Sequence, residues 1–277
     1  MTEGAAVVLC GGRSSRMGRA KAWLPWRGQP MLAHVVACMR EVVDEVVVVT
    51  SEELEPPPVD ALLVRDSAPE EGPLRGLAEG LARVEAPLAF VTGTDAPFLH
   101  ADFVRALLGY GVPVAPVVGG IVQSLAAVYP SAAAAGAREL LAARRRRPLE
   151  LLEAVDYRAL EAAELPDIEA LRGFNTPDEY LAAVGAAETP ARLDFEGSAR
   201  DAAGMEGLEV PFGPLAQVLA RAPGGLLLLE GERVSHRYAL YLEGRERVQD
   251  TRAPVGPGER VIVRDVRAPD AGKSGLQ

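Results

Sequence analysis

A loop rich in glycine and basic residues follows an apolar segment near the N-terminus. Residues 5–10 read AAVVLC, and residues 11–21 read GGRSSRMGRAK. Glycines let backbone N–H groups approach an anion closely, serines add donors, and arginines offer forked contacts. This composition favours phosphate binding, although the loop matches neither G-x-x-x-x-G-K-[ST] nor G-x-G-x-x-G. An ordinary solvated turn is the alternative that the residues alone leave open.

Lys21 closes this loop and is the strongest single candidate in it. Of the 29 basic residues, only Lys21 and Lys273 are lysines, so the sequence strongly favours arginine over lysine. A lysine retained against this bias suggests a specific role. We therefore interpret Lys21 as a phosphate ligand. A Gly-Lys-Ser does occur at residues 272–274, but Arg267 stands where the leading glycine of a phosphate loop should be, and we assign this segment no such role.

Two aspartates follow apolar segments that read as strands. Asp95 lies in FVTGTDAPF, and Asp66 ends LLVRD. A side chain just past a buried strand lies at the carboxyl edge of the sheet, where open α/β sheets bind ligands. A carboxylate there suits Mg²⁺ that bridges nucleotide phosphates. The alternatives are that Asp95 only accepts hydrogen bonds from turn amides and that Asp66 only forms a turn and helix entry.

The elements that must position these residues alternate between strands and helices over residues 1–185. Strands are predicted at 5–10, 45–50, 62–65, 88–92 and 125–129, and helices at 31–40, 74–84, 101–108 and 131–143. This alternation predicts an α/β fold with a mostly parallel, doubly wound sheet. One more helix is predicted after Thr176, where Pro177 and Glu179 complete a capping box.

A second, smaller domain is predicted after residue 190. The segment 185–190 reads GAAETP, which is typical of a domain boundary. Beyond it we predict a small α+β domain over residues 191–272 and a mobile tail at 273–277. Its strands are expected at 192–195, 208–210, 238–242 and 260–264, and its helices at 199–203 and 214–222.

Composition excludes several classes of protein. The net charge is −10, which argues against a nucleic-acid partner because such proteins need a basic surface. Two cysteines, Cys10 and Cys38, are too few for a disulfide framework or a four-cysteine zinc site. The N-terminus carries an acid where a signal peptide carries a base, and no apolar run approaches the ~20 residues that span a bilayer. We expect a soluble, cytoplasmic protein with no membrane partner.

Four segments resemble the motifs of the molybdenum cofactor guanylyltransferases, in the family's order. LCGGRSSRMGRAKAWLPWRGQPML is similar to the family's L-A-G-G-x-S-x-R-M-G-x-D-K signature, and RDSAPEEGPLRGLAEGL, VTGTDAPFL and GFNTPDEYL are similar to its later motifs. The resemblance covers residues 5–184. It implies a Rossmann-like nucleotidyltransferase domain over residues 1–185. It also implies transfer of GMP from GTP to the phosphate of molybdopterin, with Mg²⁺ and with release of pyrophosphate.

The same resemblance implies roles for individual residues. Lys21 and Arg16 would act on phosphate groups, and Asp95 would bind both the nucleotide and Mg²⁺. Leu9, Cys10 and Gly11 would contact the guanine nucleotide with backbone atoms, and Gly12 would help to shape the phosphate loop. Asp66 would lie near the nucleoside, and Asn175 would lie near the edge of the site where the second substrate binds. Cys10 stands where the family commonly has alanine, which changes nothing if only its backbone is used. Ala20 and Thr50 replace the family's usual aspartate and asparagine, and these two departures put details of nucleotide contact in question.

Residues 192–272 resemble the small ubiquitin-like sulfur carriers of molybdopterin synthase. SARDAAGME, YALYLEGRERV and VGPGERVIVRDVRAPDAG carry this similarity, which implies a β-grasp fold and a partner such as molybdopterin synthase or a molybdoenzyme. Those carriers act through a terminal glycine pair, whereas here Ala271 and Gly272 are followed by KSGLQ. We therefore expect a docking or stabilising module.

Two other functions compete with guanylyl transfer. A cytidylyltransferase or sugar-phosphate nucleotidyltransferase would use the same fold, although Gly11, Gly12 and the segment 72–74 favour guanine. A non-catalytic scaffold that delivers the cofactor is the alternative from another class, and the retention of Lys21 and Asp95 argues against it.

Overall fold

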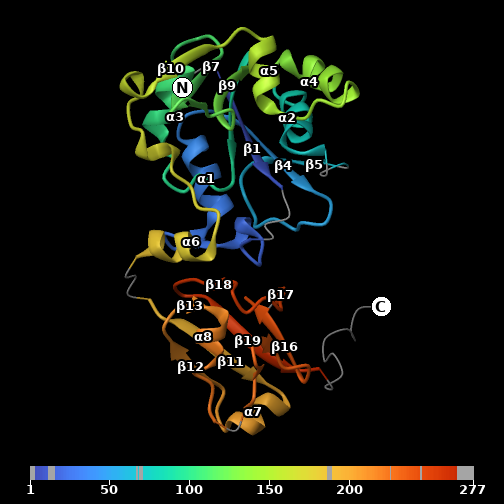
Figure 1. Cartoon of the computed structure of the whole chain (residues 1–277), viewed down its shortest axis with the longest axis vertical. Coiled ribbons are helices and arrows are strands. Elements are labelled where there is room, and N and C mark those ends of the chain that lie inside the picture. Colours follow the sequence, from blue (N-terminus) through green and yellow to red (C-terminus); the bar gives the residue numbers. More distant parts are fainter. Residues whose placement is uncertain are drawn as a thin grey trace. The chain divides into compact units, whose positions relative to one another are not determined.

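The computed structural model describes residues 4–11, 16–66, 68, 71–185, 189–224, 226–243 and 245–266. Their contacts separate the chain into two units (Figure 1). Unit one contains residues 1–13 and 21–173, and unit two contains residues 14–20 and 174–277. The predicted boundary at 185–190 as a division between folding domains stays a prediction. The predicted mobile tail lies outside the described residues.

An eight-stranded sheet forms the centre of unit one, in the order β10-β7-β9-β6-β1-β4-β5, with β8 paired to β7. The strands are β1 (Ala5–Cys10), β4 (Glu45–Ser51), β5 (Leu62–Asp66), β6 (Leu88–Gly93), β7 (Val114–Val118), β8 (Ile121–Val122), β9 (Ala126–Pro130) and β10 (Arg158–Glu161). β1 runs parallel to β4 and β6, β4 to β5, and β10 to β7. The sheet is therefore mostly parallel, as predicted.

Strands β8 and β9 are the exceptions, because β8 runs antiparallel to β7 and β9 runs antiparallel to both β6 and β7. Gly119 and Gly120 both have positive φ, at 58° and 77°, and this conformation makes a tight hairpin turn between β7 and β8. The chain reverses there and enters β9 from the opposite end of the sheet. The sequence pattern marked residues 125–129 as a strand but left β7, β8 and β10 unpredicted.

Helices cover both faces of this sheet (Figure 1). One buried cluster joins Val8 to α1 (Met31–Arg40) and α3 (Ala101–Leu108), and the other joins Val7 to α2 (Pro73–Leu81), α4 (Ala133–Ala142) and α5 (Pro148–Ala154). Successive residues of a strand point to opposite faces, so β1 contributes to both cores. The doubly wound arrangement is confirmed, and α1 and α3 have the predicted bounds.

Helix α2 lies very close to β1. A Cβ atom at Gly80 would lie 2.4 Å from Cγ1 of Val7 and 3.1 Å from Cγ2 of Val49. We expect Gly80→Ala to lower the free energy of unfolding by about 1–2 kcal/mol, because overpacking outweighs the helix propensity gained by alanine. Urea denaturation measures this change. Gly136→Ala in α4 is the matched control: its Cβ would meet Leu151 at an ordinary 3.7 Å, and equal destabilisation by both variants would contradict the prediction.

Unit two has a five-stranded sheet in the order β12-β11-β19-β16-β17. Its strands are β11 (Ala191–Glu196), β12 (Gly207–Val210), β16 (Tyr238–Leu242), β17 (Glu246–Val248) and β19 (Arg260–Asp265), and its helices are α6 (Pro177–Val184), α7 (Ser198–Ala203) and α8 (Leu215–Leu219). β11 and β19 pair in parallel, and the other pairs are antiparallel. One apolar cluster joins this sheet to α7 and α8.

Short strand pairs complete both units. They are β2 (Pro25–Trp26) with β3 (Gln29–Pro30) in unit one, and β13 (Gly213–Pro214) with β18 (Pro254–Val255) and β14 (Leu229–Glu230) with β15 (Arg233–Val234) in unit two. The predicted capping box of α6 is confirmed: Oγ1 of Thr176 accepts from the Glu179 N–H at 3.3 Å, and Oε2 of Glu179 accepts from the Thr176 N–H at 3.2 Å. Across the described residues, every helix falls short of the length and apolar character needed to cross a membrane.

Candidate active site

Asp95 lies just beyond the carboxyl end of β6, beside the end of β1. The adjoining Thr94 ties the two strand ends together, because its N–H and its hydroxyl both donate to the Leu9 carbonyl at 3.1 Å. The Asp95 side chain is 44% exposed and is therefore accessible from solvent. The structure thus confirms the predicted place of Asp95 at the carboxyl edge of the sheet.

Lys21 contacts Asp95 directly. Its Nζ lies 2.9 Å from Oδ2 of Asp95, and its side chain is only 16% exposed. Lys21 begins a single 3-10 turn, Lys21–Trp23. The sequence assigned these two residues to different partners, and the structure brings them together. A positive and a negative charge side by side can hold a phosphate oxygen and a metal cation next to each other.

The loop that carries Asp95 is packed against its surroundings. A Cβ at Gly93 would lie 2.7 Å from Oδ1 of Asp95, and a Cβ at Gly173 would lie 2.6 Å from the backbone oxygen of Asp95. The rings of Phe98 and Trp26 meet edge to face at 5.3 Å. Sequence reasoning did not find the role of Gly173, although its place at the start of GFNTPDEYL was a signal. Gly93 thus leaves room for the Asp95 carboxylate, and Gly173 leaves room for the Asp95 backbone.

The Cys10 side chain at the end of β1 is buried. Cys10 pairs in register with Thr50 of β4 and is 2% exposed, and burial raises the pKa of its thiol. A buried, protonated thiol is consistent with a backbone role at this position. Gly11 is exposed, and a Cβ built on it would meet no described atom within 4 Å. Gly12, the next predicted residue, lies outside the described residues.

Asp66 lies at the same edge but well away from Asp95. It ends β5, which is separated from β6 by β1 and β4, so three strand spacings of about 4.8 Å put the two strand ends roughly 14 Å apart. The Asp66 side chain is 9% exposed, and its Oδ1 accepts from the Ala68 N–H at 2.9 Å. Asp66 and Asp95 therefore cannot share one metal ion, but they suit the two ends of an extended ligand.

Arg16 and Asn175 belong to unit two, and their roles toward a nucleotide stay predictions. Arg16 is exposed in a turn. Asn175 is exposed just before α6, where its N–H donates to Oε2 of Glu179 at 2.6 Å. Arg19 differs from Arg16, because its Nη1 donates to both carboxylate oxygens of Glu259, at 2.8 and 2.7 Å. The Arg19 guanidinium therefore pairs with a carboxylate, whereas the composition of the loop suggested that its arginines bind phosphate.

The residues at the sheet edge fit a metal ion that arrives with its nucleotide. Within the described ranges, no group of three or more His, Cys, Asp or Glu side chains could hold a metal on its own. Mg²⁺ usually keeps several waters and binds through one or two carboxylates together with substrate phosphates. A single accessible carboxylate, Asp95, meets that requirement.

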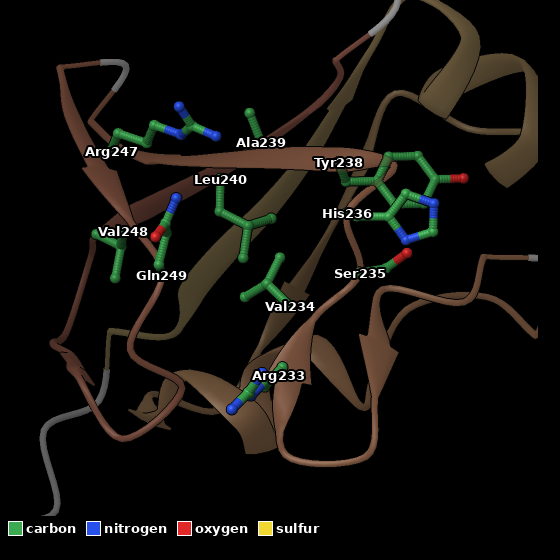
Figure 2. Close-up of a pocket in the computed structure, with 10 residues that line it drawn as sticks. All are labelled: Arg233, Val234, Ser235, His236, Tyr238, Ala239, Leu240, Arg247, Val248 and Gln249. Atoms are coloured by element: carbon green, nitrogen blue, oxygen red, sulfur yellow. The ribbon is translucent and has the colours of Figure 1, made fainter.

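A separate hollow of about 430 Å³ lies in unit two (Figure 2). Val234, Leu240 and Val248 supply apolar side chains to it, and Arg233 and Gln249 are among its polar lining residues. It contains none of the predicted site residues. The candidate active site therefore rests on the edge of the unit-one sheet.

Comparison with known proteins identifies a family for the segment that carries this sheet edge. The model of the MobA-like NTP transferase domain matches residues 6–160. A probable molybdenum cofactor guanylyltransferase of Bacillus cereus is 31% identical over 162 residues, which cover 55% of this chain and 80% of that protein. A molybdenum cofactor guanylyltransferase of Xanthomonas euvesicatoria is 41% identical over 103 residues, which cover 37% of this chain and 52% of that protein.

A solved structure shares the fold. Molybdopterin-guanine dinucleotide biosynthesis protein A from Archaeoglobus fulgidus has a TM-score of 0.54 and 20% identity, covering 63% of this chain and 94% of that one. The matched family segment contains Lys21, Asp66 and Asp95 and ends before Asn175. Since that segment spans more than half of the sequence and carries the paired lysine and aspartate at the sheet edge, the chain belongs to the MobA-like NTP transferase family.

Proposed function

We propose that this protein transfers GMP from GTP to the phosphate of molybdopterin or its molybdenum-bound form, with release of pyrophosphate. The Lys21–Asp95 pair at the carboxyl edge of the unit-one sheet carries this proposal, together with the names of the bacterial relatives. The product is a guanine dinucleotide form of the cofactor.

The reaction needs no protein nucleophile. A phosphate oxygen of molybdopterin attacks the α-phosphorus of GTP, and the bond to the pyrophosphate oxygen breaks. Catalysis of such a displacement comes from positioning and charge neutralisation. Lys21 supplies a positive charge to the phosphate groups, and Asp95 holds Mg²⁺, which when bound neutralises further phosphate charge.

Binding of GTP with Mg²⁺ exchanges the partners of the Lys21–Asp95 pair. Without ligand, the ammonium and the carboxylate compensate each other at 2.9 Å. With GTP and Mg²⁺ bound, Lys21 would pair with a phosphate oxygen and Asp95 would hold the cation, so each charge would keep an opposite partner. Asp66, about 14 Å along the edge by strand spacing, lies toward the nucleoside.

GTP with Mg²⁺ should raise the melting temperature of the full-length chain more than CTP, ATP or UTP does. A ligand at 100 times its Kd stabilises the folded state by about 2.7 kcal/mol, which corresponds to a shift of roughly 5–10 °C for a domain of this size. Thermal-shift measurements with each nucleotide, with and without Mg²⁺, test this. A larger shift with CTP would favour a cytidylyltransferase instead, and no shift with any nucleotide would favour a scaffold.

We also propose that residues 191–266 form a β-grasp domain that docks onto molybdopterin synthase or a molybdoenzyme. The strand order β12-β11-β19-β16-β17 supports this, with first and last strands β11 and β19 parallel at the centre. Helix α8 follows β12, as the helix of a β-grasp does between its two hairpins.

A further inference from the structure

Three consecutive residues of the glycine-rich motif each meet an acidic side chain within unit two. Gly18 has φ +68°, and a Cβ on it would lie 3.0 Å from Oδ2 of Asp250. Arg19 binds Glu259, and the Ala20 N–H donates to Oε1 of Glu246 at 3.0 Å. The acidic partners follow the motif by more than 220 residues in the sequence. This part of the motif is therefore held by the C-terminal part of the chain.

The central contact is a buried ion pair. The side chains of Arg19 and Glu259 are 1% and 3% exposed. Nη1 of Arg19 donates to both oxygens of Glu259 and to the Pro254 carbonyl at 3.2 Å, while Oε2 of Glu259 also accepts from the Gly256 N–H at 2.7 Å. Removing two charges from water is costly, and good geometry with additional hydrogen bonds is what offsets it. These contacts fix the Arg19 side chain in one place.

A second carboxylate reinforces the contact. Oε2 of Glu246 lies 3.4 Å from Nε of Arg19, so the guanidinium lies between two acids. Glu246 also brings its Oε1 to the Ala20 N–H. Glu246 thereby holds both the Arg19 side chain and the backbone of the next residue.

The position of these contacts along the chain gives them a functional consequence. Lys21, whose Nζ pairs with Asp95, follows Ala20 directly. The residue directly before Lys21 is therefore held by a hydrogen bond from its backbone N–H to Glu246. A misplacement of about 1 Å in a reacting group can reduce a rate roughly 10²-fold. Contacts that fix residues 18–20 therefore restrict where Lys21 can begin.

We propose that Glu259 and Glu246 are positioning residues for nucleotidyl transfer and that they act through Arg19 and Ala20. The C-terminal part of the chain is then required by the enzyme's own reaction, in addition to any docking role. This inference rests on the proposed function, because it takes Lys21 as the phosphate contact. Neither glutamate touches substrate in this scheme.

Glu259→Gln in the full-length chain tests the proposal, with Glu196→Gln as the matched control. Glu196 is half-exposed and pairs with Arg264 in the same unit, so the control removes an ion pair without touching the motif. Hydrogen exchange followed by mass spectrometry should show faster exchange of the peptide that covers residues 16–21 in Glu259→Gln. The peptide from β1 should exchange as in the parent protein. In the transfer assay kcat should fall about 10-fold, while the control changes neither readout.

Glu246→Ala keeps the test decisive if Glu259→Gln folds poorly. It removes the Ala20 contact but leaves Arg19 paired with Glu259, and we expect the same changes at smaller amplitude. Unchanged exchange of residues 16–21 in the folded variants would overturn the proposal. Faster exchange with parental kcat per folded molecule would also overturn it, because the contacts would then be purely structural.

The two hypotheses fail in different ways. If the parent protein does not transfer GMP to molybdopterin, the proposed function is wrong. Calorimetric titration with GTP and Mg²⁺ then replaces the transfer assay as the functional readout of the same variants. Weaker binding in Glu259→Gln but not in Glu196→Gln would still support the positioning role, and equal binding would overturn it.

Discussion

Lys21→Ala is expected to reduce GMP transfer by roughly 10²-fold or more, which is the usual effect of losing one charge contact to a transition state. The ammonium lies 2.9 Å from Asp95 at the sheet edge, where phosphate groups would develop charge during the displacement. Both kcat and kcat/KM should fall, because the contact strengthens as pyrophosphate leaves. Steady-state assays with GTP, Mg²⁺ and molybdopterin measure the change.

Folding should be nearly unaffected by the same substitution. The partner carboxylate is 44% exposed, so water can solvate it when the ammonium is removed. Ion pairs of this kind contribute about 1 kcal/mol or less. Lys21→Arg is the matched comparison: it keeps the charge and should retain more activity than Lys21→Ala. Parental turnover in Lys21→Ala, with an unchanged melting curve, would contradict a catalytic role.

Local patterns predicted the parts of the fold that local forces decide. The valine-rich run of β1 and the apolar spacing of α1 and α3 gave their bounds as observed. The rule that side chains past buried parallel strands meet at one edge predicted the place of Asp95. The capping box at Thr176 could also be predicted from the sequence, because all its members lie within four residues.

Features that depend on distant partners could not be predicted. A run of valines does not reveal the direction of a strand, and β9 is antiparallel because of the turn at Gly119 and Gly120. Lys21 and Asp95 are 74 residues apart, and the pattern could place both near one edge without showing that they touch. Arg19 is the extreme case, since nothing in the loop distinguishes an arginine that binds phosphate from one that pairs with a glutamate 240 residues away.

Asp95→Asn should abolish most of the activity and shift the Mg²⁺ requirement to much higher concentration. The amide keeps the shape of the side chain but removes the negative charge that attracts the cation. It also removes the charge that compensates Lys21 in the ligand-free protein. The loss should exceed that of Lys21→Ala, because cation binding and phosphate alignment both depend on this carboxylate.

A Mg²⁺ titration of transfer at saturating GTP distinguishes this role from that of a turn residue. Asp102→Asn is the matched control, since Asp102 is an exposed carboxylate on α3 that pairs with Arg105 and its loss changes the net charge equally. We expect a right-shifted titration for Asp95→Asn and a parental one for Asp102→Asn. In the double variant with Lys21→Ala, the losses of activity should be less than additive. The two residues act together on one phosphate–metal group, so removing one of them already removes most of what the other contributes. An unchanged Mg²⁺ titration in Asp95→Asn would mean that this carboxylate serves the loop rather than the metal.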